Sequence, residues 1–248
     1  GGFAMQMNDY ASGNYVLIAG LLVFVYLLYG WFADVIKESV SGFYNKQVDT
    51  SFRWSMGWFI FSEVMFFAGF FCALFYIRTF ALDWISQSTL VWPNFAAVWP
   101  TLGPAATESV EKMHALGLPA INTLILLISG ATLTWGHHGL LKNNRKQLTW
   151  GLILTILLGV LFLCLQAYEY SHAWFSFDSG IYGSLFYMLT GFHGFHVTMG
   201  TVMLFMILLR VNKGHFQPDN HFAFEGVAWY WHFVDVVWLI LFVFIYWL

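Results

Sequence analysis

The chain contains the segment GIYGSLFYMLTGFHGFHVTMGTVMLFMILLRV, residues 180–211, and this segment decides the fold class. Its only charged side chain is Arg210, which stands at its end. Because about 20 apolar residues are enough for a helix to cross a bilayer, the segment predicts a transmembrane helix. A helix of this length must tilt or project into the aqueous phase.

Five further apolar runs predict five more membrane helices, at about 14–33, 54–82, 118–140, 148–170 and 224–248. Composition agrees, because 59% of the residues are hydrophobic and only 9% are charged. A soluble domain has about 25% charged residues. The sequence therefore predicts an all-α polytopic membrane protein with six transmembrane helices in this chain and no soluble domain.

The basic residues are distributed unevenly over the connections between these helices. Eight of the ten lie in or beside the connections after the first, third and fifth helices: Lys37, Lys46, Arg53, Lys142, Arg145, Lys146, Arg210 and Lys213. The alternate connections hold Arg78 and Lys112. Because cytoplasmic loops retain Lys and Arg, these three connections are predicted to face inside and both chain ends outside.

The start of the chain suggests a further helix. An outside N-terminus needs an export signal or a preceding helix, and residues 1–13 resemble neither. The chain also opens on Gly1-Gly2 rather than on Met. We therefore expect a seventh, N-terminal helix upstream of Gly1 that is missing from the given chain.

Glu63 is the first polar group predicted to lie at membrane depth. It lies about ten residues into the predicted second helix, among phenylalanines and with no cation near it in sequence. Because a charge at that depth costs a few kcal/mol, burial favours the neutral acid. Two interpretations stay open, a proton-linked or conformational carboxyl group and a carboxyl that fixes packing by a hydrogen bond to a neighbouring helix.

His193 and His196 lie on one face of the predicted fifth helix, because they are three residues apart. Two histidines could begin a metal or haem site. No carboxylate or cysteine accompanies them at ligand spacing, so hydrogen bonds across helices are the favoured interpretation.

Glu225, His232 and Asp235 fall within an arc of about 80° on the predicted sixth helix. We expect an internal polar network, which His193, His196 or Glu63 could join. Such a network can serve packing alone or act as a proton relay.

Other polar groups are predicted near the membrane surface. His137 and His138 are adjacent and make a poor chelate, and Glu169 stands near the outer end of the fourth helix. We interpret all three as interfacial anchors. Arg210 stands at the inner end of the fifth helix, where it can bind a lipid phosphate or merely set topology.

Several motifs are absent from the sequence. It has no Walker loop, no GxGxxG after a strand, no CxxCH, no HExxH and no basic stripe for nucleic acid. Cys72 and Cys164 both lie in apolar runs and are interpreted as packing residues. These absences leave transporter, redox subunit and structural subunit open.

Six segments resemble subunit III of the haem–copper cytochrome c oxidases. They are WFADVIKES (31–39), FRWSMGWFIFSEVMFF (52–67), TWGHHG (134–139), LQAYEY (165–170), SGIYGSLFYMLTGFHGFHV (179–197) and FEGVAWYWHFVDVVW (224–238). GFHGFHV and WHFVDVVW also resemble quinol oxidase subunits. One departure is Gly42-Phe43-Tyr44, where the family often carries Gly-His-His.

The resemblance implies an architecture of seven helices. The first two would form one bundle and the other five a second, with lipids in a cleft between them. This implies a division into 1–52, an N-terminal helical part with an inner loop, and 53–248, a five-helix transmembrane bundle. The family's buried acid falls on Glu63. Trp31, Glu38 and Arg210 are the expected lipid-binding residues.

The resemblance also implies a function, that of a non-catalytic core subunit of a proton-pumping oxidase that reduces O2 to water. It would stabilise subunit I, bind phospholipids and sustain proton uptake. We expect haem and copper in partner subunits, subunit II among the partners, no cofactor in this chain and no metal on its nine histidines. Subunit III of a quinol oxidase and a proton-coupled transporter are the alternatives. The long outer loop from Asp83 to Leu118 resembles bacterial members, so we expect the bacterial inner membrane rather than the mitochondrial one.

Overall fold

The computed structural model describes residues 1–106 and 111–248 of the chain. Among these residues every regular element is a helix, and an isolated bridge between Gln217 and Asn220 is the only β-type pairing. Six helical stretches are long and apolar enough to cross a membrane, so the predicted all-α polytopic class is confirmed. The chain forms two compact units, Gly1–Phe52 and Arg53–Leu248.

The first unit consists of a short helix, a long helix and the start of a third. α1 (Gly2–Met7) folds back on the beginning of α2 (Gly13–Val40). Glycine permits this approach, since a Cβ on Gly2 would lie 2.3 Å from the backbone nitrogen of Leu17. Beyond α2, the Tyr44 hydroxyl donates a hydrogen bond to Glu38 Oε2 at 2.9 Å.

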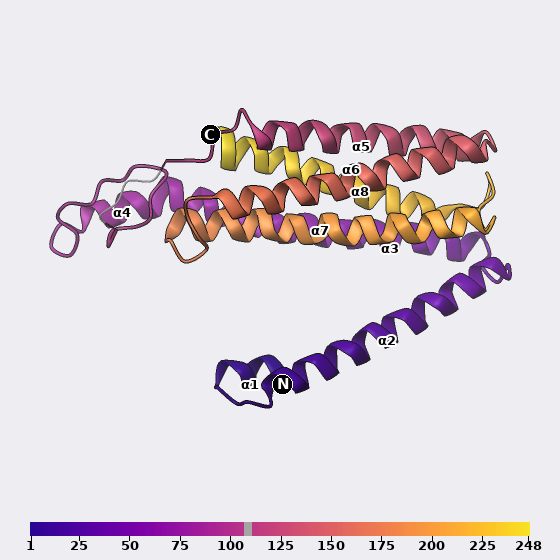
Figure 1. Ribbon diagram of the computed structural model, residues 1–248, viewed down its shortest axis with the longest axis horizontal. Coiled ribbons are helices and arrows are strands. Elements are labelled where there is room, and N and C mark those ends of the chain that lie inside the picture. The colour runs from indigo at the N-terminus through magenta and orange to yellow at the C-terminus, as the bar shows by residue number, and fades with distance from the viewer. Residues whose placement is uncertain (107–110) are drawn as a thin grey trace. The chain divides into compact units, whose positions relative to one another are not determined.

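The second unit is a helical bundle (Figure 1). α3 (Lys46–Tyr76) crosses the boundary at Phe52 and continues through a π-helical turn into α4 (Leu82–Gln87). The other helices are α5 (Leu118–Leu141), α6 (Arg145–His172), α7 (Ile181–Asn212) and α8 (Phe222–Leu241). A second π-helical segment, Phe242–Trp247, prolongs α8.

Two helix boundaries differ most from the sequence prediction. The helix predicted to begin at about residue 54 begins at Lys46. Asn45 explains the early start, because its side-chain oxygen accepts a hydrogen bond from the Val48 backbone N–H at 3.0 Å and so caps the helix. The first long helix likewise continues to Val40, beyond the predicted end, because Asp34, Lys37 and Glu38 interrupt the apolar pattern without ending the helix.

Within the second unit, consecutive helices pack on one another. α5 packs on α6, α6 on α7 and α7 on α8, and α8 returns to α5. The closest approach is made by glycines of α5 and α6, because a Cβ on Gly151 would lie 2.6 Å from Gly136 Cα. Small residues let helix backbones approach in this way within membranes.

Trp231 of α8 fills the space between α6 and α7. The side chain is fully buried, and Cβ atoms on Gly159 or Gly200 would lie 2.6 and 2.8 Å from its indole ring. Its Nε1–H donates a hydrogen bond to Ser129 Oγ of α5 at 3.0 Å. This one side chain therefore sets the rotation of α8 against three other helices.

Figure 1 shows that α5 and α7 finish at the end of the bundle where α6 and α8 begin. Most basic residues of the second unit belong to this end by their positions in the chain: Arg53, Lys142, Arg145, Lys146, Arg210 and Lys213. Arg145 there donates to the Phe216 carbonyl at 2.8 Å and ties α6 to the connection between α7 and α8. Arg78 lies at the opposite end and donates to the Leu248 carbonyl at 3.2 Å. This end of the bundle, called the basic end below, is the one that the charge count predicts to face inside.

Candidate functional site

Glu63 of α3 and His196 of α7 form a close polar pair in the middle of the bundle. His196 Nε2 lies 2.9 Å from Glu63 Oε2, and His196 Nδ1 lies 2.6 Å from the Phe192 carbonyl. The two side chains are 22% and 8% exposed. Phe67 packs its ring edge on the imidazole at 5.0 Å and helps to exclude solvent.

The hydrogen bonds of this pair determine how many protons it holds. A carbonyl only accepts, so His196 Nδ1 must carry a proton. The contact between Nε2 and Glu63 then needs a second proton, which sits either on the carboxyl oxygen or on the ring. Both arrangements have zero net charge, so the pair can lie among apolar side chains without an uncompensated ion.

His193 lies one turn from this pair but does not contact it. Its side chain is fully buried, and its Nε2–H donates to the Val234 carbonyl of α8 at 3.1 Å. The ring packs against Trp238 at 5.0 Å and Phe162 at 5.6 Å. This arrangement anchors α7 to α8.

His232 and Asp235 of α8 face α5. Their Nδ1 and Oδ2 atoms are 3.8 Å apart, and the His232 side chain is 45% exposed whereas Asp235 is 8% exposed. Gly130 of α5 makes room for the carboxylate, because a Cβ there would lie 2.6 Å from Oδ2. The hydroxyl oxygen of Thr134, which also belongs to α5, lies 3.4 Å from His232 Nε2.

Glu225, the third polar residue of the predicted arc on α8, lies at the basic end. Its carboxylate is in ion-pair contact with Arg53 of α3, and Oε1 lies 3.3 Å from His221 Nε2. Among the described residues, no hydrogen bond links Glu225 to the pairs described above. The polar residues expected to form one network therefore occupy four separate places.

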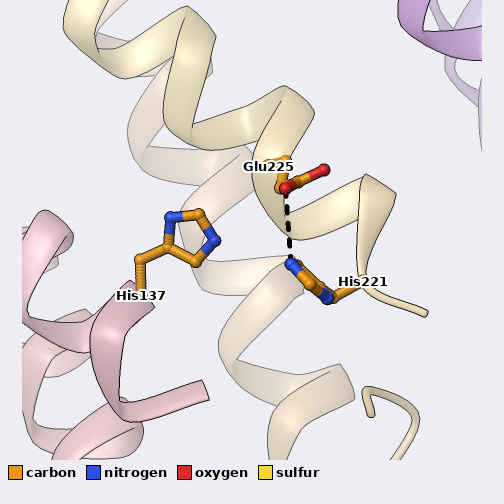
Figure 2. Close-up of side chains that lie close together, drawn as sticks. All are labelled: His137, His221 and Glu225. Atoms are coloured by element: carbon orange, nitrogen blue, oxygen red, sulfur yellow. Dashed lines mark ion pairs between the residues drawn. The ribbon is translucent and has the colours of Figure 1, made fainter. Parts of the chain in front are cut away.

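His137 joins Glu225 and His221 across the interface between α5 and α8. Figure 2 shows its ring pointing from α5 toward the two side chains of α8. One potential ligand atom from each of the three residues lies within 4.8 Å of those of the others. The sequence did not predict this set, because His137 stands far from the other two residues in the chain and only tertiary packing brings it near.

Glu169 of α6 corrects another expectation. It was predicted as an anchor at the membrane surface, but it is only 2% exposed. Both carboxyl oxygens are buried, and the side chains of Tyr246 and Gln166 are the polar groups beside them. Gln166 and Asn122 are also buried, and their side chains are joined at 3.4 Å. The prediction failed because a position near a helix end does not show which way the side chain points, and Glu169 faces the interior of the bundle.

Arg210, one of the three residues expected to bind lipid, lies at the basic end of α7. It is 9% exposed, and its guanidinium lies over the Phe216 ring at 4.6 Å. Partial burial, followed by the charges of Arg210 and Lys213, lowers the pKa of the nearby His215. Positive charge is therefore concentrated here.

The other two expected lipid-binding residues belong to the first unit. Trp31 is 64% exposed and stacks on Phe32 at 5.5 Å between ring centroids. Glu38 is exposed and accepts the hydrogen bond of Tyr44 described above. Both residues lie on the charged second half of α2, which the sequence prediction had left partly outside the helix.

Known proteins resemble this chain along its whole length. The sequence model described as "Cytochrome c oxidase subunit III" matches residues 1–248. A protein named cytochrome c oxidase subunit 3 from Drosophila melanogaster is 44% identical over 247 residues, which cover 99% of this chain and 87% of that protein. Proteins of the same name from Prototheca wickerhamii and Hippopotamus amphibius are 43% and 44% identical, over 99% and 94% of this chain and 88% and 83% of theirs.

Proposed function

The chain belongs to the cytochrome c oxidase subunit III family, and we propose that it is a non-catalytic core subunit of a proton-pumping oxidase. The match over all 248 residues is the observation that carries this proposal. In this role the protein packs directly on subunit I, with subunit II as a further partner in the complex. It stabilises subunit I, binds phospholipids and sustains proton uptake while subunit I reduces O2 to water.

The hydrogen bonds of His196 support the absence of a redox centre from this subunit. A haem or copper ligand needs a ring nitrogen with a free lone pair. Both nitrogens of His196 are engaged, with Phe192 and Glu63, so this histidine has no free lone pair to offer a metal ion. We therefore assign the haem and copper of the oxidase to its partner subunits.

Purification of the complex in mild detergent, through a tag on this chain, tests the assignment. The expected result is that the chain carries with it a large subunit with haem and copper, and that the complex oxidises reduced cytochrome c. Recovery of the chain alone, without haem, would contradict the proposal. Oxidation of quinol rather than cytochrome c would instead favour the quinol oxidase branch, which shares the GFHGFHV and WHFVDVVW motifs.

The lipid-binding role of this subunit rests on Arg210. Its guanidinium is held in place over Phe216, beside other positive charge at the basic end. Arginine can hold a phosphate through two parallel hydrogen bonds. Trp31 and Glu38 are proposed to contribute to lipid binding from α2, where the indole ring suits the headgroup layer.

The variant Arg210→Ala tests this role against Lys213→Ala as its control, because Lys213 is an exposed cation three residues away. We expect the Arg210 variant to lose co-purified phospholipid and to inactivate earlier during turnover, with a nearly normal initial rate. The Lys213 variant should retain both lipid and lifetime. Unchanged lipid content and lifetime in the Arg210 variant would leave this arginine as a topology-setting charge.

The six long apolar helices make the chain a multi-pass membrane protein, and we propose the bacterial inner membrane as its location. The long connection between α4 and α5 supports this choice over the mitochondrial inner membrane. Finding the gene on a bacterial chromosome would support the proposal, whereas an organelle genome would contradict it.

A further inference from the structure

We propose that His137, His221 and Glu225 form a binding site for a divalent transition-metal ion, with Zn2+ as the preferred ion. The site lies at the basic end of the bundle and joins the last turns of α5 to the first turns of α8 (Figure 2). The His137 and His221 ring centroids are 5.6 Å apart. This inference revises the expectation from sequence that no histidine of the chain binds a metal.

The orientation of His221 supports the site. Its Nδ1 lies 3.2 Å from the Gln217 carbonyl, which only accepts, so Nδ1 carries the proton. In the neutral ring Nε2 then presents a lone pair, and this atom lies 3.3 Å from Glu225 Oε1. A hydrogen bond from the other ring nitrogen to a backbone carbonyl fixes the tautomer of many metal-binding histidines. Two lone pairs at this distance repel each other unless a proton or a cation lies between them.

His137 favours a metal ion over a proton in that position. Its Nε2 is buried and has no hydrogen-bond partner among the described residues. A proton shared by His221 and Glu225 would leave this nitrogen unsatisfied. A metal ion bound to all three residues would satisfy His137 as well, and an unsatisfied buried polar atom is costly.

Arg53 determines which carboxylate oxygen of Glu225 is available to the metal ion. It is in contact with Glu225 Oε2, whereas Oε1 is the oxygen nearest His221. The guanidinium therefore orients the carboxylate from outside the ligand set, as hydrogen-bonded partners of metal ligands commonly do. Its positive charge opposes the ion, so we expect reversible binding rather than a permanently held structural metal.

The ligand types indicate the class of ion. Two imidazoles and one carboxylate suit Zn2+, whereas Ca2+ and Mg2+ prefer oxygen ligands. Three protein ligands leave a fourth tetrahedral position for water. Zinc bonds of roughly 2.0–2.2 Å require ligand atoms about 3.3 Å apart. The present separations of up to 4.8 Å therefore need a small closure of the side chains.

Zinc binding to the protein purified with its accompanying subunits tests the proposal. After chelator treatment, equilibrium dialysis against radioactive Zn2+ should show one bound ion fewer per complex in His137→Ala and in His221→Ala than in the wild type. The matched control is His138→Ala, which removes the adjacent, exposed histidine and should keep the wild-type count. Equal zinc binding by wild type and His137→Ala would overturn the site and leave an ion-pair cluster only.

A second measurement needs no variant and so does not depend on assembly of the mutants. Anomalous X-ray scattering at the zinc edge, from crystals of the wild-type complex equilibrated with Zn2+, should place an ion between the three side chains. Zinc found only at other positions, with His137 Nε2 unbound, would overturn the proposal. In crystals equilibrated with Mg2+ or Ca2+ instead, ordinary difference density should show no ion between the three side chains.

Discussion

Two groups of polar residues in the second unit differ in how completely their hydrogen-bonding atoms are paired. In the middle of the bundle, His196 uses both ring nitrogens, one with Glu63 and one with a carbonyl of its own helix. At the basic end, His137 and His221 each have a buried Nε2 without a hydrogen-bond partner among the described residues. The first group is complete without a ligand, whereas the second has the free lone pairs that a metal ion requires.

This difference predicts that only the basic end responds to zinc. At a free Zn2+ concentration one hundred times the dissociation constant, the wild type should gain about 2.7 kcal/mol of stability. Melting of the purified complex, followed by circular dichroism with and without Zn2+, measures the gain. His137→Ala should lose most of the response, and an undiminished response in that variant would contradict the prediction.

Breaking the complete pair should have the next largest effect. Glu63→Ala leaves His196 Nε2 buried without a partner, and we expect a loss of about 2 kcal/mol in the free energy of unfolding. Glu63→Gln should lose much less and still assemble, because its amide N–H can donate to the ring nitrogen. The two variants are compared by the yield of the assembled complex and by its melting temperature. Equal damage by Gln and Ala would show that the acid proton or the charge is required.

Breaking the ion pair at the basic end should cost less. The Arg53 and Glu225 side chains are 37% and 18% exposed, so solvent screens their attraction. We expect Arg53→Gln to lower stability by about 0.5–1 kcal/mol, with a smaller loss at high salt. The same melting measurement at two salt concentrations tests this. A loss as large as that of Glu63→Ala, and independent of salt, would show that Arg53 acts as a buried charge.

The smallest effect is expected for His138, the exposed neighbour of His137. His138→Ala should change stability by less than about 0.5 kcal/mol, as surface substitutions commonly do. Its zinc response in the melting measurement should equal that of the wild type. A clear loss of the zinc response would place His138 rather than His137 in the ligand set.

The sequence by itself determined the membrane class, the six helices and the family. Hydrophobicity and helix length are local properties, so a run such as residues 180–211 identifies its helix without reference to the rest of the fold. The uneven distribution of Lys and Arg likewise predicts orientation from chain order alone. Errors remained at helix ends, where Asn45 capped α3 earlier than the apolar pattern indicated.

Only the tertiary structure decided which polar groups meet. Glu63 and His196 are 133 residues apart and touch because α3 packs on α7. His137 meets Glu225 because glycines hold α5 against α6 and Trp231 sets the rotation of α8. A polar arc on one helix shows which side chains share a face, but not their depth or the residue opposite each one. Those depend on how the helices rotate and cross, and close packing between helices sets that geometry.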